Sequence, residues 1–409
     1  MENVSSSNGL EKRPKLRFPG FDDPYRTITL GQIASLVNRT DPTSNAPIMM
    51  LSAGNGFIMQ SEKYSRDNAG QSLKKYILLK KGELAYNHGA SKAKQYGCCY
   101  ELTEDEARIP YVYHCFKVSG AEHTPYVATA LNNPKIDRQL KRLVSSSVRM
   151  DGLLNISFDD YMSVILHLPS LKEQTHIADF LKKLDERITA QEKLVASLKK
   201  YKRGLLRKVF AKLSDSCEKR NLKEVSVLFA DGDWIESKDQ ALDGIRLIQT
   251  GNVGFGVYID KTQNAKYISE TTFHRLNCLE IYDGDILISR LPEPAGRACL
   301  LPKSTERRIT AVDCTVIRTD SSVIDRNYLL QFLCSEQYLK TVNSFLAGGT
   351  RQRISRKNLE GIEVPYPSID EQRYWGSFLC KVDARISNEE QRRSSLSRLR
   401  CFMLQQLFI

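Results

Sequence analysis

One long segment occurs twice in this chain. Residues 169–210 (PSLKEQTHIADFLKKLDERITAQEKLVASLKKYKRGLLRKVF) return without a gap as residues 367–408 (PSIDEQRYWGSFLCKVDARISNEEQRRSSLSRLRCFMLQQLF). The copies lie much farther apart than the repeats of about 20–50 residues that build solenoids. The pattern therefore describes two copies of a large unit, each a globular body followed by a long helix. A protein with two similar bodies is expected to recognise two similar targets.

Both copies of the repeated segment begin with the start signal of a helix. Ser170 is followed by Glu173, and Ser368 by Glu371, which is the S-x-x-E pattern of a capping box. Apolar residues then recur at heptad spacing with polar interruptions, a pattern typical of a coiled coil whose register is fixed by polar residues. The predicted core positions are Ile177, Leu181, Leu184, Ile188, Gln191, Val195, Leu198, Lys202, Leu205 and Val209 in the first helix, and Trp375, Leu379, Val382, Ile386, Glu389, Arg393, Leu396, Arg400, Met403 and Leu407 in the second. We expect the helices to form an antiparallel pair; the alternative is two separate surface helices, each covering its own body.

The two bodies that precede the helices share landmarks in the same order. SAGN (52–55) corresponds to QTGN (249–252), KY (63–64) to KY (266–267), and KKGELAYN (80–87) to YDGDILIS (282–289). Short alternating apolar runs punctuated by Gly and Asn favour β-rich bodies, and the shared Gly-acid-apolar piece predicts a turn that enters a strand. Because the framework recurs while the intervening loops differ, we expect the loops to bind different targets.

The predicted fold is therefore α+β. It consists of two β-rich recognition domains separated by a pair of long antiparallel coiled-coil helices, with an internal pseudo-twofold repeat. The predicted divisions are an N-terminal segment (1–19), the first domain (20–168), the first spacer helix (169–212), the second domain (213–366) and the second spacer helix (367–409).

The composition is that of an ordinary globular protein, with 41% hydrophobic and 26% charged residues. No apolar run approaches the roughly 20 residues of a membrane span, and the first residues lack the apolar core of a signal peptide, so we expect a cytoplasmic protein with no membrane partner. Ten cysteines without C-x-x-C spacing predict reduced, mostly buried thiols and no metal site.

The net charge of +12 favours a polyanionic partner. The excess is concentrated in the first repeated segment, where residues 169–212 hold twelve Lys and Arg against five Asp and Glu. The most basic run, KKYKRGLLRK (199–208), fits two interpretations equally well. It is either a solvated helix end that complements the helix dipole or a surface that contacts phosphates.

Taken together, these features resemble a known family. The opening KLRFPGF (15–21), the two P-S-x-x-E-Q helix starts and the repeated Gly-acid-apolar strand entry are similar to the specificity subunits of Type I restriction–modification systems, in the same order and over essentially the whole chain. The resemblance implies that each body is a target-recognition domain that reads one half of a split, asymmetric site in double-stranded DNA. It also implies that the helix pair sets the spacer and docks two modification (methyltransferase) subunits, and that motor-nuclease restriction subunits join them.

Candidate DNA-binding residues lie in loops that follow the repeated strand and near the ends of the bodies. Base recognition needs donors and acceptors in a groove, and Arg and Gln can make the bidentate contacts that distinguish guanine and adenine. The candidates are Asn87, His88, Ser91, Lys92, Lys94, Gln95 and Tyr96 in the first loop, Arg149 near the end of the first body, Ser289, Arg290 and Arg297 in the second loop, and Thr350, Arg351, Gln352 and Arg353 in the GGTRQR stretch. That stretch fits a Gly-bearing turn equally well.

The sequence offers no catalytic constellation. Asp23-Pro24-Tyr25 lacks the second proline of the N/D-P-P-Y/F motif of amino-methyltransferases, and neither G-x-x-x-x-G-K-S/T nor H-E-x-x-H occurs. We therefore expect no catalytic residues, no cofactor and no metal, and a chain that supplies specificity to an enzyme complex. Two alternatives stay open: a coiled-coil adaptor whose two domains bind protein or sugar, and a specificity factor for a methyltransferase that has no restriction partner.

Overall fold

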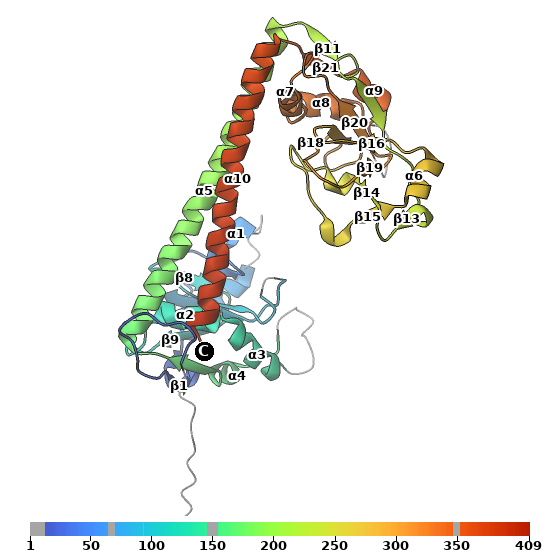
Figure 1. The fold of residues 1–409 in the computed structure, drawn as a ribbon. Helices are drawn as coiled ribbons and strands as arrows, with labels where there is room; N and C mark the ends of the chain where they lie inside the picture. Colours follow the sequence, from blue (N-terminus) through green and yellow to red (C-terminus); the bar gives the residue numbers. More distant parts are fainter. Residues whose placement is uncertain (1–12, 64–69, 93, 145–153, 347–351) are drawn as a thin grey trace, which may run out of the picture. The chain divides into compact units, whose positions relative to one another are not determined.

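The computed structural model describes residues 13–409 except 64–69, 93, 145–153 and 347–351. The chain forms two compact units, Met1–Ala190 with Arg393–Ile409, and Gln191–Arg392. The two long helices, α5 (Leu171–Ser216) and α10 (Ile369–Leu407), each contribute to both units (Figure 1). Each unit therefore combines one β-rich body with part of α5 and part of α10.

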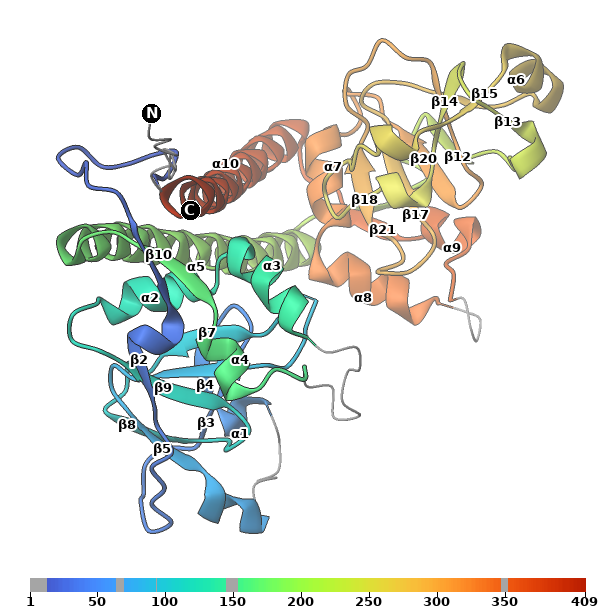
Figure 2. The same cartoon turned by 90° about the horizontal axis from the view of Figure 1, so that it is seen from below.

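The body of the first unit is built on a four-stranded antiparallel sheet in the order β2-β9-β6-β7. Three antiparallel strand pairs, β1-β10, β3-β4 and β5-β8, complete it. The strands are β1 (Arg26–Thr29), β2 (Ala34–Leu36), β3 (Met49–Ser52), β4 (Gly56–Met59), β5 (Ile77–Lys80), β6 (Leu84–Asn87), β7 (Cys98–Glu101), β8 (Glu106–Ile109), β9 (His114–Val118) and β10 (Ile165–Leu168). The short helices are α1 (Gln60–Lys63), α2 (Thr124–Leu131), α3 (Pro134–Leu143) and α4 (Phe158–Met162). Figure 2 shows α2 and α3 between the four-stranded sheet and the long helices. Side chains from this sheet, from α2 and α3 and from both long helices share one core.

The body of the second unit repeats the four-stranded sheet, in the order β12-β20-β17-β18, and adds a five-stranded sheet in the order β13-β15-β14-β19-β16. The strands are β11 (Lys219–Asn221), β12 (Leu228–Asp231), β13 (Gln240–Ala241), β14 (Ile245–Ile248), β15 (Lys266–Ile268), β16 (Glu280–Ile281), β17 (Ile286–Ser289), β18 (Ala298–Leu300), β19 (Arg308–Thr310), β20 (Cys314–Arg318) and β21 (Glu363–Pro365). The short helices are α6 (Glu270–Leu276), α7 (Arg326–Leu333), α8 (Glu336–Ser344) and α9 (Arg356–Glu360).

The two units repeat the same connections, which confirms the internal repeat. The first and last strands of each body pair antiparallel, as β1-β10 and β11-β21. A glutamine in the first turn of each long helix accepts from the backbone N–H that precedes a short helix: Gln174 from His123 (3.0 Å) and Gln372 from Asp325 (3.0 Å). Both glutamines also donate to the carbonyl five residues earlier. These buried amides fix the start of each long helix on its own body.

The predicted turn into a strand is present in both bodies. A glycine with positive φ (+81° and +88°) precedes β6 and β17, and an acidic residue follows it. The Glu83 carboxylate accepts from the backbone three residues before it (2.8 Å) and pairs with Arg39 (2.7 Å). The Asp285 carboxylate makes the same two contacts, at 2.9 Å to the backbone and 2.7 Å to Arg318. The acid therefore holds the turn and ties it to a neighbouring segment.

The helix starts agree with the predicted capping boxes only in part. The hydroxyls of Ser170 and Ser368 accept from the N–H groups of Glu173 and Glu371, at 3.4 Å in each case. The Glu173 carboxylate, however, does not close the box, because it is fully buried and bonded to Arg17 (2.7 and 2.9 Å). The opening segment of the chain is thereby attached to the start of α5.

The two long helices pack antiparallel, as predicted, and polar residues pair between them in both units. In the first unit Arg400 donates to Asp185 (3.0 Å for Nη2 to Oδ2). In the second unit Gln191 donates to the Glu389 carboxylate (2.6 Å). Lys202 likewise pairs with a carboxylate of α10 (2.5 Å to Asp383). Four of the five polar interruptions of the heptad pattern, Gln191, Lys202, Glu389 and Arg400, thus meet a partner on the other helix and help to fix the register, whereas Arg393 is exposed.

The end of each long helix is embedded in the core of a body. Phe408 stacks on Tyr126 with ring centroids 5.0 Å apart, and Phe210 contacts Tyr328 at 5.5 Å. The two phenylalanines occupy equivalent places in the sequence repeat. The end of α10 therefore packs in the core of the first unit, and the end of α5 in that of the second.

Candidate nucleic-acid interface

The loop that follows β6 is anchored at both ends. His88 is only 5% exposed, and its two ring nitrogens lie 2.9 Å from the carbonyl oxygens of Leu154 and Val112. At the other end, Gly97 has a φ of +82°, and a Cβ there would lie 2.4 Å from the Asn87 carbonyl oxygen. Only glycine closes the loop this tightly.

The middle of this loop presents polar side chains to solvent. Ser91, Lys92 and Gln95 are exposed. Lys94 is partly buried, because its ammonium donates to the backbone carbonyl at the end of α2 (2.8 Å). The Tyr96 carbonyl accepts from a tyrosine hydroxyl of β6 (2.6 Å). The loop thus offers one exposed cation and two exposed neutral polar groups, held on a rigid base.

The corresponding loop of the second body, residues 289–298, keeps its first polar side chains inside the protein. Ser289 is fully buried, and Arg290 is 3% exposed. The Arg290 guanidinium donates to a backbone carbonyl (2.6 Å) and lies 3.3 Å from Asp231 and 3.8 Å from Asp313. Burial lowers the pKa of this guanidinium. Arg290 therefore joins this loop to β12 and to the strand start at β20.

Arg297 organises the same loop from its other end. Its guanidinium donates to four backbone carbonyl oxygens, those of Thr250, Val253, Leu291 and Pro294, at 2.7–3.1 Å. Loop carbonyls have no strand partner, and a guanidinium with five donors can satisfy several at once. The exposed tip of this loop carries Pro and Glu side chains instead of cations.

The remaining candidates lie near the ends of the bodies. Arg149, Thr350 and Arg351 fall outside the described residues. Gln352 is exposed, and Arg353 is about half exposed, with its Nη1 3.4 Å from an aspartate carboxylate at the start of β20.

The structure therefore divides the candidates by accessibility. Those committed to contacts within the protein are Asn87, His88, Lys94, Tyr96, Ser289, Arg290 and Arg297. Those that face solvent are Ser91, Lys92, Gln95, Gln352 and Arg353. Contact of any of them with DNA remains a prediction, and the accessible set is the stronger starting point.

Sequence reasoning missed a cationic pocket in the second body. It is a cavity of about 170 Å³ lined chiefly by Arg246, Gln249, Gly251, Lys261, Asn264 and Lys266, and no carboxylate is among its lining residues in the described part of the chain. Two landmarks of the repeat, QTGN and KY, form its walls. The recurrence of these landmarks in both bodies was the only sequence signal that could have pointed to the pocket, but it was interpreted as a shared framework.

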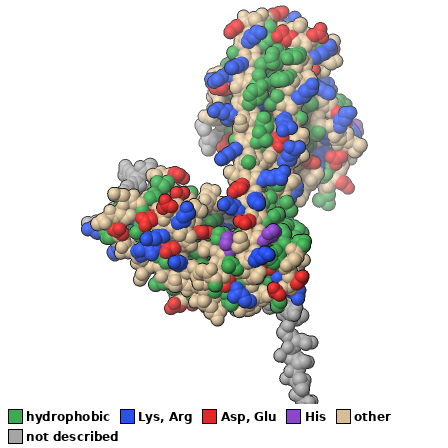
Figure 3. All heavy atoms as spheres, turned by 90° about the vertical axis from the view of Figure 1, so that its left-hand side faces the viewer, with side chains coloured by type: hydrophobic (Ala, Val, Ile, Leu, Met, Phe, Trp, Pro, Cys, Tyr) green, Lys and Arg blue, Asp and Glu red, His purple; other side chains and the backbone are tan. Residues whose placement is uncertain are grey.

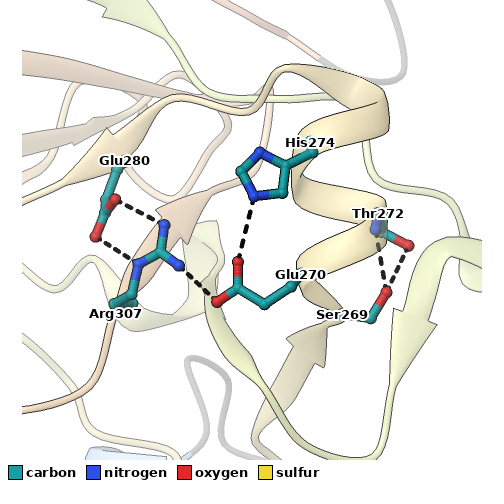
Figure 4. A network of polar contacts seen from close by, with 6 residues as sticks. All are labelled: Ser269, Glu270, Thr272, His274, Glu280 and Arg307. Atoms are coloured by element: carbon teal, nitrogen blue, oxygen red, sulfur yellow. Dashed lines mark hydrogen bonds and ion pairs between the residues drawn. The ribbon is translucent and has the colours of Figure 1, made fainter.

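A polar network steadies the sheet that carries this pocket (Figure 4). Arg307 holds Glu280 with two bonds of 3.0 Å and Glu270 with one of 2.5 Å, and these bonds raise the pKa of its guanidinium. Glu270 also lies 3.8 Å from His274 within α6. The Arg307 carbonyl in turn accepts from the backbone N–H of Arg246 (2.9 Å). The network therefore joins α6 and β16 to the strand from which Arg246 projects.

In the described residues, two further properties concern membranes and metals. No helix is both long enough and apolar enough to cross a membrane. No group of three or more His, Cys, Asp or Glu side chains is placed to hold a metal ion. The ten cysteines are free thiols and most are buried, as predicted.

The second half of the chain is similar to a known protein family. Residues 214–398 match the family model of the Type I restriction modification DNA specificity domain. The chain is 23% identical over 273 residues to the Type I restriction enzyme MjaVIII specificity subunit of Methanocaldococcus jannaschii. This match covers 62% of this chain and 64% of that protein. It is 22% identical over 240 residues to the putative MjaX specificity subunit of the same organism, covering 56% and 55%. The matches thus span about three fifths of these relatives.

The fold resembles solved structures over nearly the whole chain. The S subunit of a Type-I restriction-modification system from M. genitalium has a TM-score of 0.56 at 16% identity, with 97% of this chain and 99% of that chain covered. A chain from a study of complex assembly and conformational transition of the type I R-M system also has a TM-score of 0.56, at 18% identity, with 95% and 98% covered. At these identities the likeness shows the fold.

The fold thus defines a duplicated α+β protein with two β-rich, loop-bearing bodies and a pair of long helices. Residues 214–398 match the Type I restriction modification DNA specificity domain, which is just under half of the chain. Together, the domain, the relatives and the fold confirm the predicted resemblance to the specificity subunits of Type I restriction–modification systems.

Proposed function

We propose that this chain is the DNA-sequence specificity subunit of a Type I restriction–modification complex. The observation that carries the proposal is the duplication: two units share one strand order and the same contacts at the helix starts, while their loops differ. Two copies of one scaffold with different loops suit the two different halves of a split, asymmetric site in double-stranded DNA. The specificity domain matched by residues 214–398 supports the same function.

In this proposal the chain supplies recognition without catalysis. Methyl transfer and DNA cleavage belong to two modification subunits and to motor-nuclease restriction subunits that assemble with it. Because its target is chromosomal or invading DNA, the chain works in the cytoplasm.

Exposed apolar side chains on the long helices support docking of the modification subunits. In the second unit Leu194 (40% exposed) and Tyr201 (56%) lie on the face of α5 that also carries the partly buried Leu198 and Leu205. In the first unit Leu399, the sequence equivalent of Tyr201 in the repeat, is 43% exposed on α10. Figure 3 shows hydrophobic side chains gathered along the long helices. Repeated apolar surfaces suit two copies of one partner, since exposed apolar patches mark interaction sites.

The helix pair is proposed to set the spacer between the half-sites. Deletion of residues 190–193 from α5 is expected to change the preferred spacer but neither half-site, because about four residues remove roughly 6 Å of helix. The antiparallel pairing requires a matched deletion of 388–391 from α10, so that Asp185–Arg400 and Lys202–Asp383 keep their register. If the half-sites change while the folded state is retained, the helices do not act as a spacer.

The deciding experiment is a map of adenine methylation across the source genome, with the gene intact and deleted. Loss of one split motif on deletion would establish the specificity function and give both half-sites and the spacer. An unchanged methylome, together with absence of sequence-selective DNA binding by the purified complex, would contradict the proposal and favour a protein- or sugar-binding adaptor.

A further inference from the structure

We propose that the cationic pocket of the second body binds one backbone phosphate of the DNA. The inference rests on the proposed function and deepens it, because it assigns a sequence-independent contact to residues outside the predicted loops. Phosphate contacts position a protein on a duplex, while contacts to base edges specify the sequence.

The charges of the pocket suit an anion. Three cations, Arg246, Lys261 and Lys266, line it, and the nearest carboxylate partner is that of Asp260, 3.3 Å from the Arg246 guanidinium. Lys261 and Lys266 are exposed at the rim. The site therefore has a positive balance and a route of access for a phosphate.

Arg246 is poorly satisfied for a buried arginine. Its side chain is 5% exposed, yet its two contacts to side-chain oxygens, with Tyr267 and Asp260, are both 3.3 Å long. Charge-assisted bonds to a carboxylate or phosphate are ordinarily about 2.7–2.9 Å. The guanidinium thus has donor capacity for a further oxygen, and a phosphate in the pocket would supply it.

Gly251 gives the pocket its shape. A Cβ at this position would lie 2.6 Å from the Lys261 ammonium nitrogen, so only glycine lets that ammonium rest against the turn at 249–252. The backbone of Gly251 is not in the left-handed region, and the groups that an alanine would meet are the end of the Lys261 side chain. Gly251→Ala is therefore expected to displace one cation from the pocket without disturbing the fold.

The residues that line the pocket favour a phosphate over a base. Arg246, Lys261 and Lys266 come from three separate chain positions and converge on one small cavity, which suits the negative charge shared by the two non-bridging oxygens of a backbone phosphate. In the corresponding turn of the first body, residues 52–55, Met49 stands at the position that Arg246 occupies in the second body, so this buried cation is not shared by the two bodies.

The test measures binding of the full-length chain to a duplex that carries the site recovered from the methylome, across about 50–200 mM salt. Loss of one phosphate contact lowers the slope of log affinity against log salt by about 0.9. We expect this change in the variant with Lys261→Ala and Lys266→Ala, and a weakening by Gly251→Ala in the same direction. The losses should be equal on the cognate and a scrambled duplex. Lys238→Ala is the matched control, since Lys238 is exposed on the same body but paired with Glu236 (2.8 Å).

A scan with neutral methylphosphonate linkages completes the test. One position, near the half-site read by the second body, should weaken the wild type but not the double variant. An unchanged salt slope in the double variant overturns the phosphate site. So does a loss confined to the cognate second half-site, which would make the lysines base contacts. Absence of salt-dependent DNA binding by the wild type, both alone and in the purified complex, would instead refute the proposed function itself.

Discussion

Phe210, in the last turns of α5, and Phe408, directly after α10, offer the sharpest test of how each unit is held together. Phe408 is 4% exposed and stacks on Tyr126, and Phe210 is fully buried between Tyr328 and Phe332. Truncation of a buried phenylalanine to alanine costs about 3–5 kcal/mol from lost transfer free energy and the cavity left behind. We expect about 3 kcal/mol for Phe408→Ala, because Phe408 lies outside the hydrogen-bonded turns of α10 and its surroundings can relax into the gap, and about 4 kcal/mol for Phe210→Ala, which lies within α5.

Hydrogen exchange measured for each unit separately is the appropriate assay, since a chain of two units need not unfold in one two-state step. Phe408→Ala should lower protection in the first unit, in α2, α3 and the end of α10, and leave the second unit unchanged. Phe210→Ala should do the opposite. The control is Phe402→Ala, because Phe402 is 52% exposed on α10 and its loss should cost less than about 0.5 kcal/mol.

Two results would refute this reasoning. If Phe408→Ala destabilised the first unit no more than Phe402→Ala, the end of α10 would not be part of its core. If either core variant lowered protection equally in both units, packing would not be local to a unit.

Other contacts can be tested in the same way. The hydrogen bond from Gln191 holds the pKa of Glu389 below its ordinary value near 4.5, so its stabilisation is complete above that value and is lost as pH falls through the lower folded pKa. Urea titrations should therefore show Glu389→Gln less stable than the wild type at neutral pH, with the two converging in acid; a gap that persists in acid would contradict this. Arg297→Lys should speed hydrogen exchange across 289–298, because an ammonium cannot donate to all four carbonyls that Arg297 bonds. Unchanged exchange would show that these four hydrogen bonds do not hold the loop. Gln372→Leu should destabilise the second unit by about 1–3 kcal/mol, since it leaves the buried N–H of Asp325 unpaired, and denaturant unfolding would show no loss if that bond were dispensable.

Much of the fold could be predicted because its signals are local. The repeated segment, the serines that cap both helices and the apolar heptads all act over a few residues, and each is present in the structure. The capping box at the start of α5 is only half formed. The Glu173 carboxylate does not bond back to the helix start, because it binds Arg17, which is far away in the sequence. A local motif describes what a side chain can reach, but a stronger distant partner decides what it binds.

The candidate site was less predictable for the same reason. Arg290 and Arg297 lie in a loop where exposed cations were expected, yet carbonyls and carboxylates from other segments hold them inside the body. Nothing in the loop sequence indicates this, since the groups that satisfy these guanidinium groups include Thr250, 47 residues before Arg297, and Asp231, which is farther still from Arg290 along the chain.

The sequence by itself determined that this protein is a duplicated pair of bodies with two long helices, because periodicity and helix caps are properties of short stretches of chain. Tertiary structure alone decided which polar side chains stay available to a ligand. How far a cation stays available to a ligand depends on the carbonyls and carboxylates that distant segments fold against it. By the same rule, folding placed Arg246 beside Lys261 and Lys266 and so formed a cationic pocket that no single stretch of sequence contains.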